Sequence, residues 1–515
     1  MRTALFYFLL AFQLSFVSVW AQTCPTRPSP RSTVTDPLNV FSQSGVLSTN
    51  LAIENYLSSG FILYCYAYQT GVEAPTLNLN PGDTLSLNLT NQIQQYLAAQ
   101  PLQHEHKSAG SNPSPSNSVP ADSDCNGTMT SASTNLHFHG MNIPPKCHED
   151  ETLFTLINPG DPAFLYQFQV PADEPPGLYW YHPHPHGLTE SQVLGGASGA
   201  LIVEGIETVK PEVAGLTQRV LVLRDQPSGP MTINFVPTSP GTPVISTAPS
   251  EKQFWRVLNA EADVFVNLQI KINGTPQTIQ VVAIDGVPLQ TDYLTTSFEL
   301  PPAGRVEFIM QGPPTGGTGT FSTLGVDTGI NGNPDPAVLI ANITPSGDPA
   351  KATRIPELDP AKKQRFADLI STIPVATRNL YFSEYLGSDG NSQFYITVEG
   401  QKPKFFQPND PPAIVTTQGS VENWTIQNQA EEIHAFHIHQ LHFMVMAING
   451  VALKSPYMAD TISIPGWTGT GTYPSVTVRM DFRDPETVGT FVYHCHILLH
   501  EDNGMMAKIQ VNPAN

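Results

Sequence analysis

The chain has 515 residues, which allows two to four domains of ordinary size. Its 48 prolines and 38 glycines, its sparse charge and its lack of evident helical repeats exclude a mainly helical protein and favour an all-β, loop-rich one. The formal net charge of −20 argues against partners that reward positive patches, so we expect no binding to nucleic acid or to anionic membrane surfaces.

Residues 1–21 are predicted to be a signal peptide. An apolar run at 4–19 follows Arg2 and ends at a small-x-small-like cleavage site at 19–21. The run is too short to predict a membrane span, and no other stretch reaches spanning length without interruption. We therefore expect a secreted or periplasmic protein that has no membrane span and is monomeric.

The first block of the mature chain is predicted at 22–205, with 22 to about 60 as a mobile lead-in. Apolar and polar residues alternate on both sides of the turn residues 81–83, which predicts strand, turn and strand over 75–90. The Ser/Pro-rich stretch 107–124 is expected to be an exposed insertion. Further strand-like runs lie at 164–170 and 199–204.

The second block, 206–350, is predicted to be a scaffold. It contains no cysteine, no histidine and no carboxylates that are clustered in sequence. A linker is predicted at 351–375, with one short helix possible at 360–370. Strands in the second block are expected at 219–225, 253–258 and 280–286.

The third block, 376–515, repeats a pattern of the first. Gly419 precedes a strand-like run at 421–426, as Gly82 precedes one in the first block, and a histidine pair follows each. This weak internal similarity suggests that the first and third blocks are related β-sandwiches.

Cysteine usage separates one residue from the other four. Four cysteines in the first third of the chain could form two disulfides in an oxidising compartment, and their three possible pairings remain open. Cys495 is left over, as expected for a metal ligand. The four are Cys24, Cys65, Cys125 and Cys147.

Cys495 lies between His494 and His496 at the end of a strand-like run. Successive side chains of a strand point to opposite faces, so the two imidazoles share one face and the thiol points to the other. His500 and Met505 follow shortly after. Thiolate, imidazole and a weak thioether are the ligands of a blue copper electron-transfer site.

Four His-x-His units occur in β-favouring contexts, so each should project two imidazoles onto one face. A single unit is a weak signal, whereas eight imidazoles together suit a cluster of copper ions. The units are His137/His139, His182/His184, His437/His439 and His494/His496.

In these motifs the chain resembles the multicopper oxidases, the family of laccases, ascorbate oxidase and bacterial copper oxidases. The matching stretches are LHFHG at 136–140, YWYHPHPHG at 179–187, HAFHIHQLHF at 434–443 and HCHILLHEDNGMM at 494–506. The resemblance implies three cupredoxin-like Greek-key β-sandwich domains at 22–205, 206–350 and 376–515. Ala435 and Gln440 depart from the family's usual proline and glycine, but neither departure removes a ligand.

The resemblance also implies four copper ions. His434, Cys495 and His500 would hold the type 1 ion, with Met505 as the weak axial ligand. His137 and His437 would hold the type 2 ion. The type 3 pair would take His139, His182, His184, His439, His494 and His496. His186 could compete with His182 as the partner of His184, but the preceding Trp180-Tyr181 favours His182/His184.

The implied reaction joins one-electron oxidation of a small donor to four-electron reduction of dioxygen to water. Electrons would cross from Cys495 to His494 and His496, with Glu501 as proton relay and Asp150 or Glu149 as a weaker candidate. Phenols and aromatic amines are the expected donors. Oxidation of Cu(I) or Fe(II) in metal homeostasis is the alternative, although the 11 methionines form no methionine-rich insert. Copper storage or simple electron transfer would need only part of the ligand set.

Overall fold

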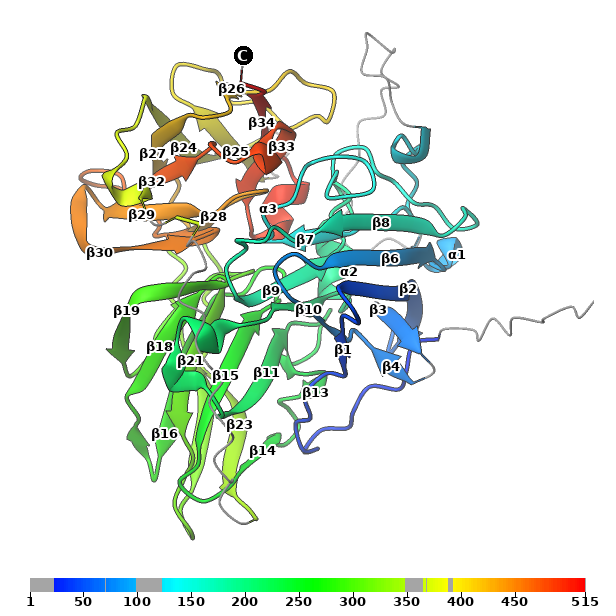
Figure 1. Ribbon diagram of the computed structural model, residues 1–515, viewed down its shortest axis with the longest axis vertical. Coiled ribbons are helices and arrows are strands. Elements are labelled where there is room, and N and C mark those ends of the chain that lie inside the picture. Colours follow the sequence, from blue (N-terminus) through cyan, green and yellow to red (C-terminus); the bar gives the residue numbers. More distant parts are fainter. Residues whose placement is uncertain are drawn as a thin grey trace, which may run out of the picture.

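The computed structural model describes residues 23–69, 71–98, 123–347, 365–366, 368–387 and 392–514. Its regular structure is almost entirely β-strand, arranged in six sheets that form three consecutive pairs (Figure 1). The predicted signal peptide, most of the insertion at 107–124 and most of the linker at 351–375 lie outside the described residues.

The first pair joins the sheet β1-β5-β10-β9-β7 to the sheet β4-β3-β2-β6-β8. The strand, turn and strand predicted at 75–90 are confirmed as β5 and β6. Its elements are β1 (Asn39–Phe41), β2 (Val46–Ser58), β3 (Phe61–Gln69), β4 (Val72–Glu73), β5 (Thr76–Leu79), β6 (Thr84–Asn91), α1 (Gln95–Ala98), η1 (Ser123–Cys125), β7 (His137–His139), β8 (Phe164–Gln169), β9 (Gly177–His182), α2 (Thr189–Leu194) and β10 (Gly199–Val203).

The mobile lead-in expected before residue 60 is wrong. Strand β2 runs for 13 residues, pairs with β3 and lies parallel to β6. Its side chains alternate in exposure along the first half, and Leu47, Leu51 and Ile53 are buried in the core of this pair. The parallel partner β6 supplies the backbone hydrogen bonds that the local sequence does not reveal.

The second pair joins β13-β12-β11-β15-β21-β18-β19 to β14-β23-β22-β16-β17, with β20 also pairing β16. The three strands predicted in this block are confirmed as β11, β15 and β18. Its elements are η2 (Ile206–Thr208), η3 (Pro211–Val213), β11 (Thr217–Arg224), β12 (Thr232–Ile233), β13 (Val236–Pro237), β14 (Val244–Thr247), β15 (Lys252–Asn259), β16 (Val266–Ile272), β17 (Thr275–Pro276), β18 (Ile279–Ile284), β19 (Val287–Thr295), β20 (Phe298–Leu300), β21 (Arg305–Gln311), β22 (Gly319–Leu324) and β23 (Val338–Pro345).

The third pair joins β25-β24-β27-β32-β29-β30 to β26-β34-β33-β28-β31. The helix predicted at 360–370 falls partly outside the described residues. The described part of that range contains only the start of the short 3-10 helix η4. Its elements are η4 (Leu369–Ser371), β24 (Ala376–Leu386), β25 (Ser392–Val398), β26 (Ile414–Thr417), β27 (Val421–Asn428), β28 (His434–Ile438), β29 (Phe443–Ile448), β30 (Val451–Ala459), β31 (Thr461–Ile464), β32 (Ser475–Asp481), η5 (Pro485–Thr487), β33 (Gly489–Cys495), α3 (Leu498–Asp502) and β34 (Met506–Asn512).

Each pair encloses its own apolar core, with Tyr66, Trp255 and Trp424 among the fully buried side chains. Burying one large apolar side chain contributes about 1.5–3 kcal/mol, so these cores account for much of the fold's stability. Helix α3 lies where the first and third pairs meet (Figure 1) and contacts α2. None of the helices in the described part of the chain is long and apolar enough to cross a bilayer.

Two disulfides stabilise the first pair. They join Cys24 to Cys65 and Cys125 to Cys147, which selects one of the three pairings left open by the sequence. Cys495 is free and buried, as expected for the odd cysteine.

Candidate metal centre

Sheet register brings the histidine-bearing strands together in two places. In the first pair, β7 and β9 run antiparallel with His137 opposite His182. In the third pair, β28 and β33 run antiparallel with His437 opposite His494. The second histidine of each unit follows two residues later. All eight rings are 0–2 % exposed, and they meet where the first and third pairs join.

The eight rings form three groups, two of which share His139, and in each group one nitrogen per ring lies within 4.8 Å of the others. Two groups contain the six histidines that the resemblance assigns to the type 3 pair, and the third contains the two assigned to type 2. The groups are His139/His182/His496, His184/His439/His494 and His137/His139/His437. His186 lies outside them and has an edge-to-face contact with Phe406.

The rings are held in a form that suits metal ions. Several place Nδ1 within 2.8–2.9 Å of a protein oxygen, so that Nε2 is left to face the cluster. The Nε2 atoms of His137, His182 and His437 are buried without a hydrogen-bond partner, which is costly unless an ion binds there. Burial lowers the pKa of His184 to about 3 and that of His437 to about 4, so both rings stay neutral, the form that binds metals.

A second, mononuclear set lies on the other side of β33. The Sγ of Cys495 is 3.6 Å from Nδ1 of His434 and 3.9 Å from Nδ1 of His500, and the two ring nitrogens are 3.3 Å apart. Burial raises the pKa of the Cys495 thiol, so a thiolate there needs the charge of a bound ion. These donors fit copper, the metal that the resemblance implies.

The backbone of Met505 is hydrogen-bonded to two residues of the same set. The N–H of Cys495 donates to its carbonyl at 3.0 Å, and its own N–H donates to the carbonyl of His500 at 2.9 Å. The side chain is fully buried in the core of the third pair. Cys495 thus belongs to the mononuclear set, while its chain neighbours His494 and His496 belong to the eight-histidine cluster.

Glu501 lies against the cluster. Its carboxylate oxygens are 3.1 Å from Nδ1 of His494 and 3.5 Å from Nε2 of His184, and the residue is fully buried. Burial raises the pKa of Glu501 well above its ordinary value, which favours the protonated form of the carboxyl group. The next residue, Asp502, fixes α3 by accepting the backbone N–H groups of Gly187 and Glu190.

Asp150 lies against a different histidine of the cluster, His137. Both of its oxygens are within 3.0 Å of Nδ1 of His137, and the backbone N–H of Phe138 donates to it at 2.9 Å. Gln440 donates to it from Nε2 at 2.5 Å. Gln440 has a left-handed backbone with φ of 59°, a conformation that glycine adopts freely, so the departure from glycine adds a contact to Asp150. Sequence reasoning missed this role.

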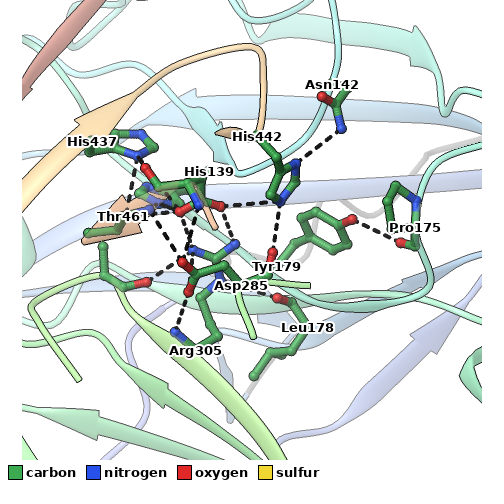
Figure 2. Close-up of polar contacts among 12 residues, drawn as sticks. His139, Asn142, Pro175, Leu178, Tyr179, Asp285, Arg305, His437, His442 and Thr461 are labelled. Atoms are coloured by element: carbon green, nitrogen blue, oxygen red, sulfur yellow. Dashed lines mark hydrogen bonds and ion pairs between the residues drawn. The ribbon is translucent and has the colours of Figure 1, made fainter. Parts of the chain in front are cut away.

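The second block, predicted to be a scaffold, also supplies residues that contact the surroundings of the cluster. Arg305 and Asp285 extend from that block to the residues that hold His139 and His437 (Figure 2). They carry no motif that the sequence alone would reveal, because their partners lie far away in the chain. His442, which the sequence left unassigned, is fully buried beside the same residues.

Carboxylates also line the outer edge of the mononuclear set. Oε1 of Glu384 is 3.1 Å from Nε2 of His434, and Oε2 of Glu432 is 3.7 Å from Nε2 of His500. Burial and the neighbouring Glu384 raise the pKa of Glu432 to about 8, with added repulsion from Asp263 of the second block. These acids, far apart in the sequence, had not been predicted to meet.

Comparison with known proteins agrees with the site. Sequence profiles describing multicopper oxidases match residues 125–208 and 384–515. A relative named multicopper oxidase mco, from Staphylococcus haemolyticus, is 24% identical over 467 residues, covering 86% of this chain and 83% of its own. A laccase of Bacillus subtilis is 22% identical over 385 residues, covering 67% of this chain and 72% of its own.

Solved structures support the predicted fold. A multicopper oxidase from Campylobacter jejuni, described as a metallo-oxidase, matches with a TM-score of 0.67 and 21% identity over 94% of this chain and 96% of its own. The predicted all-β, cupredoxin-like architecture is therefore confirmed. The profiles, the relatives and the buried histidine clusters together place this chain in the multicopper oxidase family, oxidoreductases that use copper and dioxygen.

Proposed function

We propose that this multicopper oxidase takes its electrons one at a time from Fe(II) and uses them to reduce dioxygen to water. The observation that carries the proposal is the pair of carboxylates, Glu384 and Glu432, between solvent and the mononuclear set. Their side chains are 15 % and 18 % exposed, whereas those of the imidazoles behind them, His434 and His500, are 0 % and 3 % exposed. A donor therefore meets carboxylate oxygens before it meets a ring edge.

The charge of this edge favours a cation. Glu384 and Glu432 lie close enough to share a proton. Asp263 and Asp335 also repel a negative charge on Glu432. A divalent cation bound at this edge would displace the proton from Glu432 and relieve the repulsion among these acids. Carboxylate oxygens suit hard divalent ions, whereas Cu(I) prefers thioether and thiolate sulfur, so the edge fits Fe(II) better than Cu(I).

A phenol or aromatic amine is the second candidate donor. The carboxylate of Glu384 is partly exposed and lies 3.1 Å from Nε2 of His434, so it could accept the proton that a phenol releases when it loses an electron. The relative named as a laccase is consistent with this alternative.

Copper, when bound, would accept single electrons at the mononuclear set and deliver four to dioxygen at the eight-histidine cluster. The protein's own residues would do the rest. Cys495 and its neighbours His494 and His496 provide a short covalent link between the two sites, and the buried protein around them excludes water. Glu501 would supply protons from its position beside His184 and His494.

We also propose secretion or export to the periplasm as the route of this protein. The two disulfides support it, because such bonds form and persist in oxidising compartments. The predicted leader at 1–21 is in keeping with this route.

Steady-state oxygen consumption with Fe(II), Cu(I) and a phenol tests the donor. Glu384→Gln and Glu432→Gln should each raise KM for Fe(II) about tenfold, the effect of losing about 1.4 kcal/mol of binding, and leave KM for the phenol within twofold. Glu399→Gln is the control, because that acid lies away from the site and bonds to Asn379. If both variants keep the wild-type KM for Fe(II), or if phenol oxidation suffers more, the proposed donor is wrong.

A further inference from the structure

We propose that Arg305 and Asp285, from the second pair of sheets, position two of the cluster's histidines through Asp460. The proposal rests on copper binding to the eight-histidine cluster and does not depend on which donor supplies electrons. It gives the second pair of sheets, which contributes no histidine, a direct part in shaping the dioxygen-reducing site.

Asp460 holds one histidine from each half of the cluster. Its Oδ1 is 3.2 Å from Nε2 of His139, and its backbone carbonyl is 2.8 Å from Nδ1 of His437. Each contact fixes which nitrogen carries the proton, because the oxygen must accept it. The opposite atoms, Nδ1 of His139 and Nε2 of His437, are then left as lone-pair donors, and neither has another partner.

Arg305 fixes the carboxylate of Asp460. Its Nη1 donates to Oδ1 at 2.8 Å and its Nη2 to Oδ2 at 2.5 Å, a two-pronged contact between fully buried groups. Its Nε also donates to the carbonyl of Leu178 on β9 at 3.2 Å. One side chain on β21 therefore connects all three pairs of sheets at the edge of the cluster (Figure 2).

Asp285 fixes the backbone on which Asp460 lies. It accepts the N–H groups of Asp460 at 3.2 Å and of Thr461 at 3.3 Å, and the N–H of Arg305 at 2.9 Å. This restrains the Asp460 carbonyl that holds His437. The carbonyl of Asp285 also accepts Nε2–H of His442 at 2.8 Å, which closes the far end of the network (Figure 2).

The chain offers a matched control one strand away. Arg256 on β15 is also fully buried, and its Nη1 donates to Oε2 of Glu307 at 2.6 Å. Glu307 accepts the N–H of Leu178, the residue whose carbonyl Arg305 binds. The ion pairs Arg305–Asp460 and Arg256–Glu307 therefore both join β21 to β9. Of the two, only Arg305–Asp460 includes a residue that holds the cluster's histidines.

Arg305→Lys and Arg256→Lys, both loaded with copper, test the proposal. Arg305→Lys keeps the positive charge but loses the two-pronged contact with Asp460. We expect roughly 10- to 100-fold weaker copper binding at the cluster, because this is the usual effect of disturbing a group that orients a metal-binding histidine. The paramagnetic resonance signal of type 2 copper should change, and the blue absorption of the Cys495 site should not. Arg256→Lys should match the wild type in all three measurements.

Asp285→Asn gives a second route to the same readout if Arg305→Lys does not fold. It preserves side-chain size and removes one of the two acceptor oxygens, so it should also alter the type 2 signal. Wild-type copper affinity and an unchanged type 2 signal in the folded variants would overturn the proposal. An equal change in Arg256→Lys would also overturn it, because it would indicate only general destabilisation.

Discussion

Gly140, the residue after His139, lies against the Arg305–Asp460 pair so closely that a side chain there has no room. Its backbone is left-handed, with φ of 85°, and a Cβ would lie 2.5 Å from both Nη2 of Arg305 and Oδ2 of Asp460. Gly140→Ala should therefore force the pair apart. Gly82→Ala is the matched control, since Gly82 has φ of 91° and nothing within 4 Å of its would-be Cβ.

The two substitutions share one energetic term and differ in another. A left-handed backbone costs an alanine about 1–2 kcal/mol, and both variants incur this cost. Gly140→Ala also separates a fully buried ion pair, which adds about 3–5 kcal/mol. The expected destabilisation is thus about 1–2 kcal/mol for Gly82→Ala and about 4–7 kcal/mol for Gly140→Ala.

Urea denaturation of the copper-free protein, followed by tryptophan fluorescence, provides the measurement. Trp180 is fully buried and its ring lies 5.1 Å from that of His139, so the signal includes the affected region. Three pairs of sheets need not unfold in one step, and the comparison therefore uses the midpoints of the same transition in each variant. Equal midpoints for Gly140→Ala and Gly82→Ala would refute the close approach on which the reasoning depends.

Two further predictions concern the copper sites themselves. Met505→Leu should raise the reduction potential of the Cys495 site, because an axial thioether stabilises the oxidised ion and leucine offers no donor; redox titration with an unchanged potential would rule out the axial role. Glu501→Gln should slow dioxygen reduction by roughly 100-fold or more while preserving the blue absorption, because the amide keeps the shape but cannot deliver a proton. Unimpaired turnover of the glutamine variant would exclude Glu501 as the relay.

The histidine clusters could be predicted from the sequence because their signal is local. Alternating strand geometry puts both members of a unit such as His137/His139 on one face, and the spacing of His494, Cys495 and His496 separates thiol from imidazoles without knowledge of the fold. The same locality explains why the sequence predicts β5 and β6 but not β2, whose parallel pairing with β6 is a contact between distant segments.

The supporting residues could not be predicted, because their partners lie far away in the chain. Arg305 and Asp460 are 155 residues apart, and Gln440 contacts Asp150 across 290 residues. A lone buried charge has no periodicity and no motif, so only the folded arrangement reveals its use. The disulfide pairing is of the same kind, since three pairings are equally compatible with the order of the cysteines.

The composition of the metal groups also dictates when copper can enter the protein. Every metal-binding group found in the described residues includes at least one residue between His434 and His500, near the end of the chain. The mononuclear set therefore needs the third pair of sheets, and the eight-histidine cluster also needs that pair to dock onto the first. Copper can therefore fill the eight-histidine cluster only once these two pairs of sheets have folded and met. An ion present at about 100 times its dissociation constant would then stabilise the folded protein by about 2.7 kcal/mol. The free energy of unfolding therefore depends on the supply of copper.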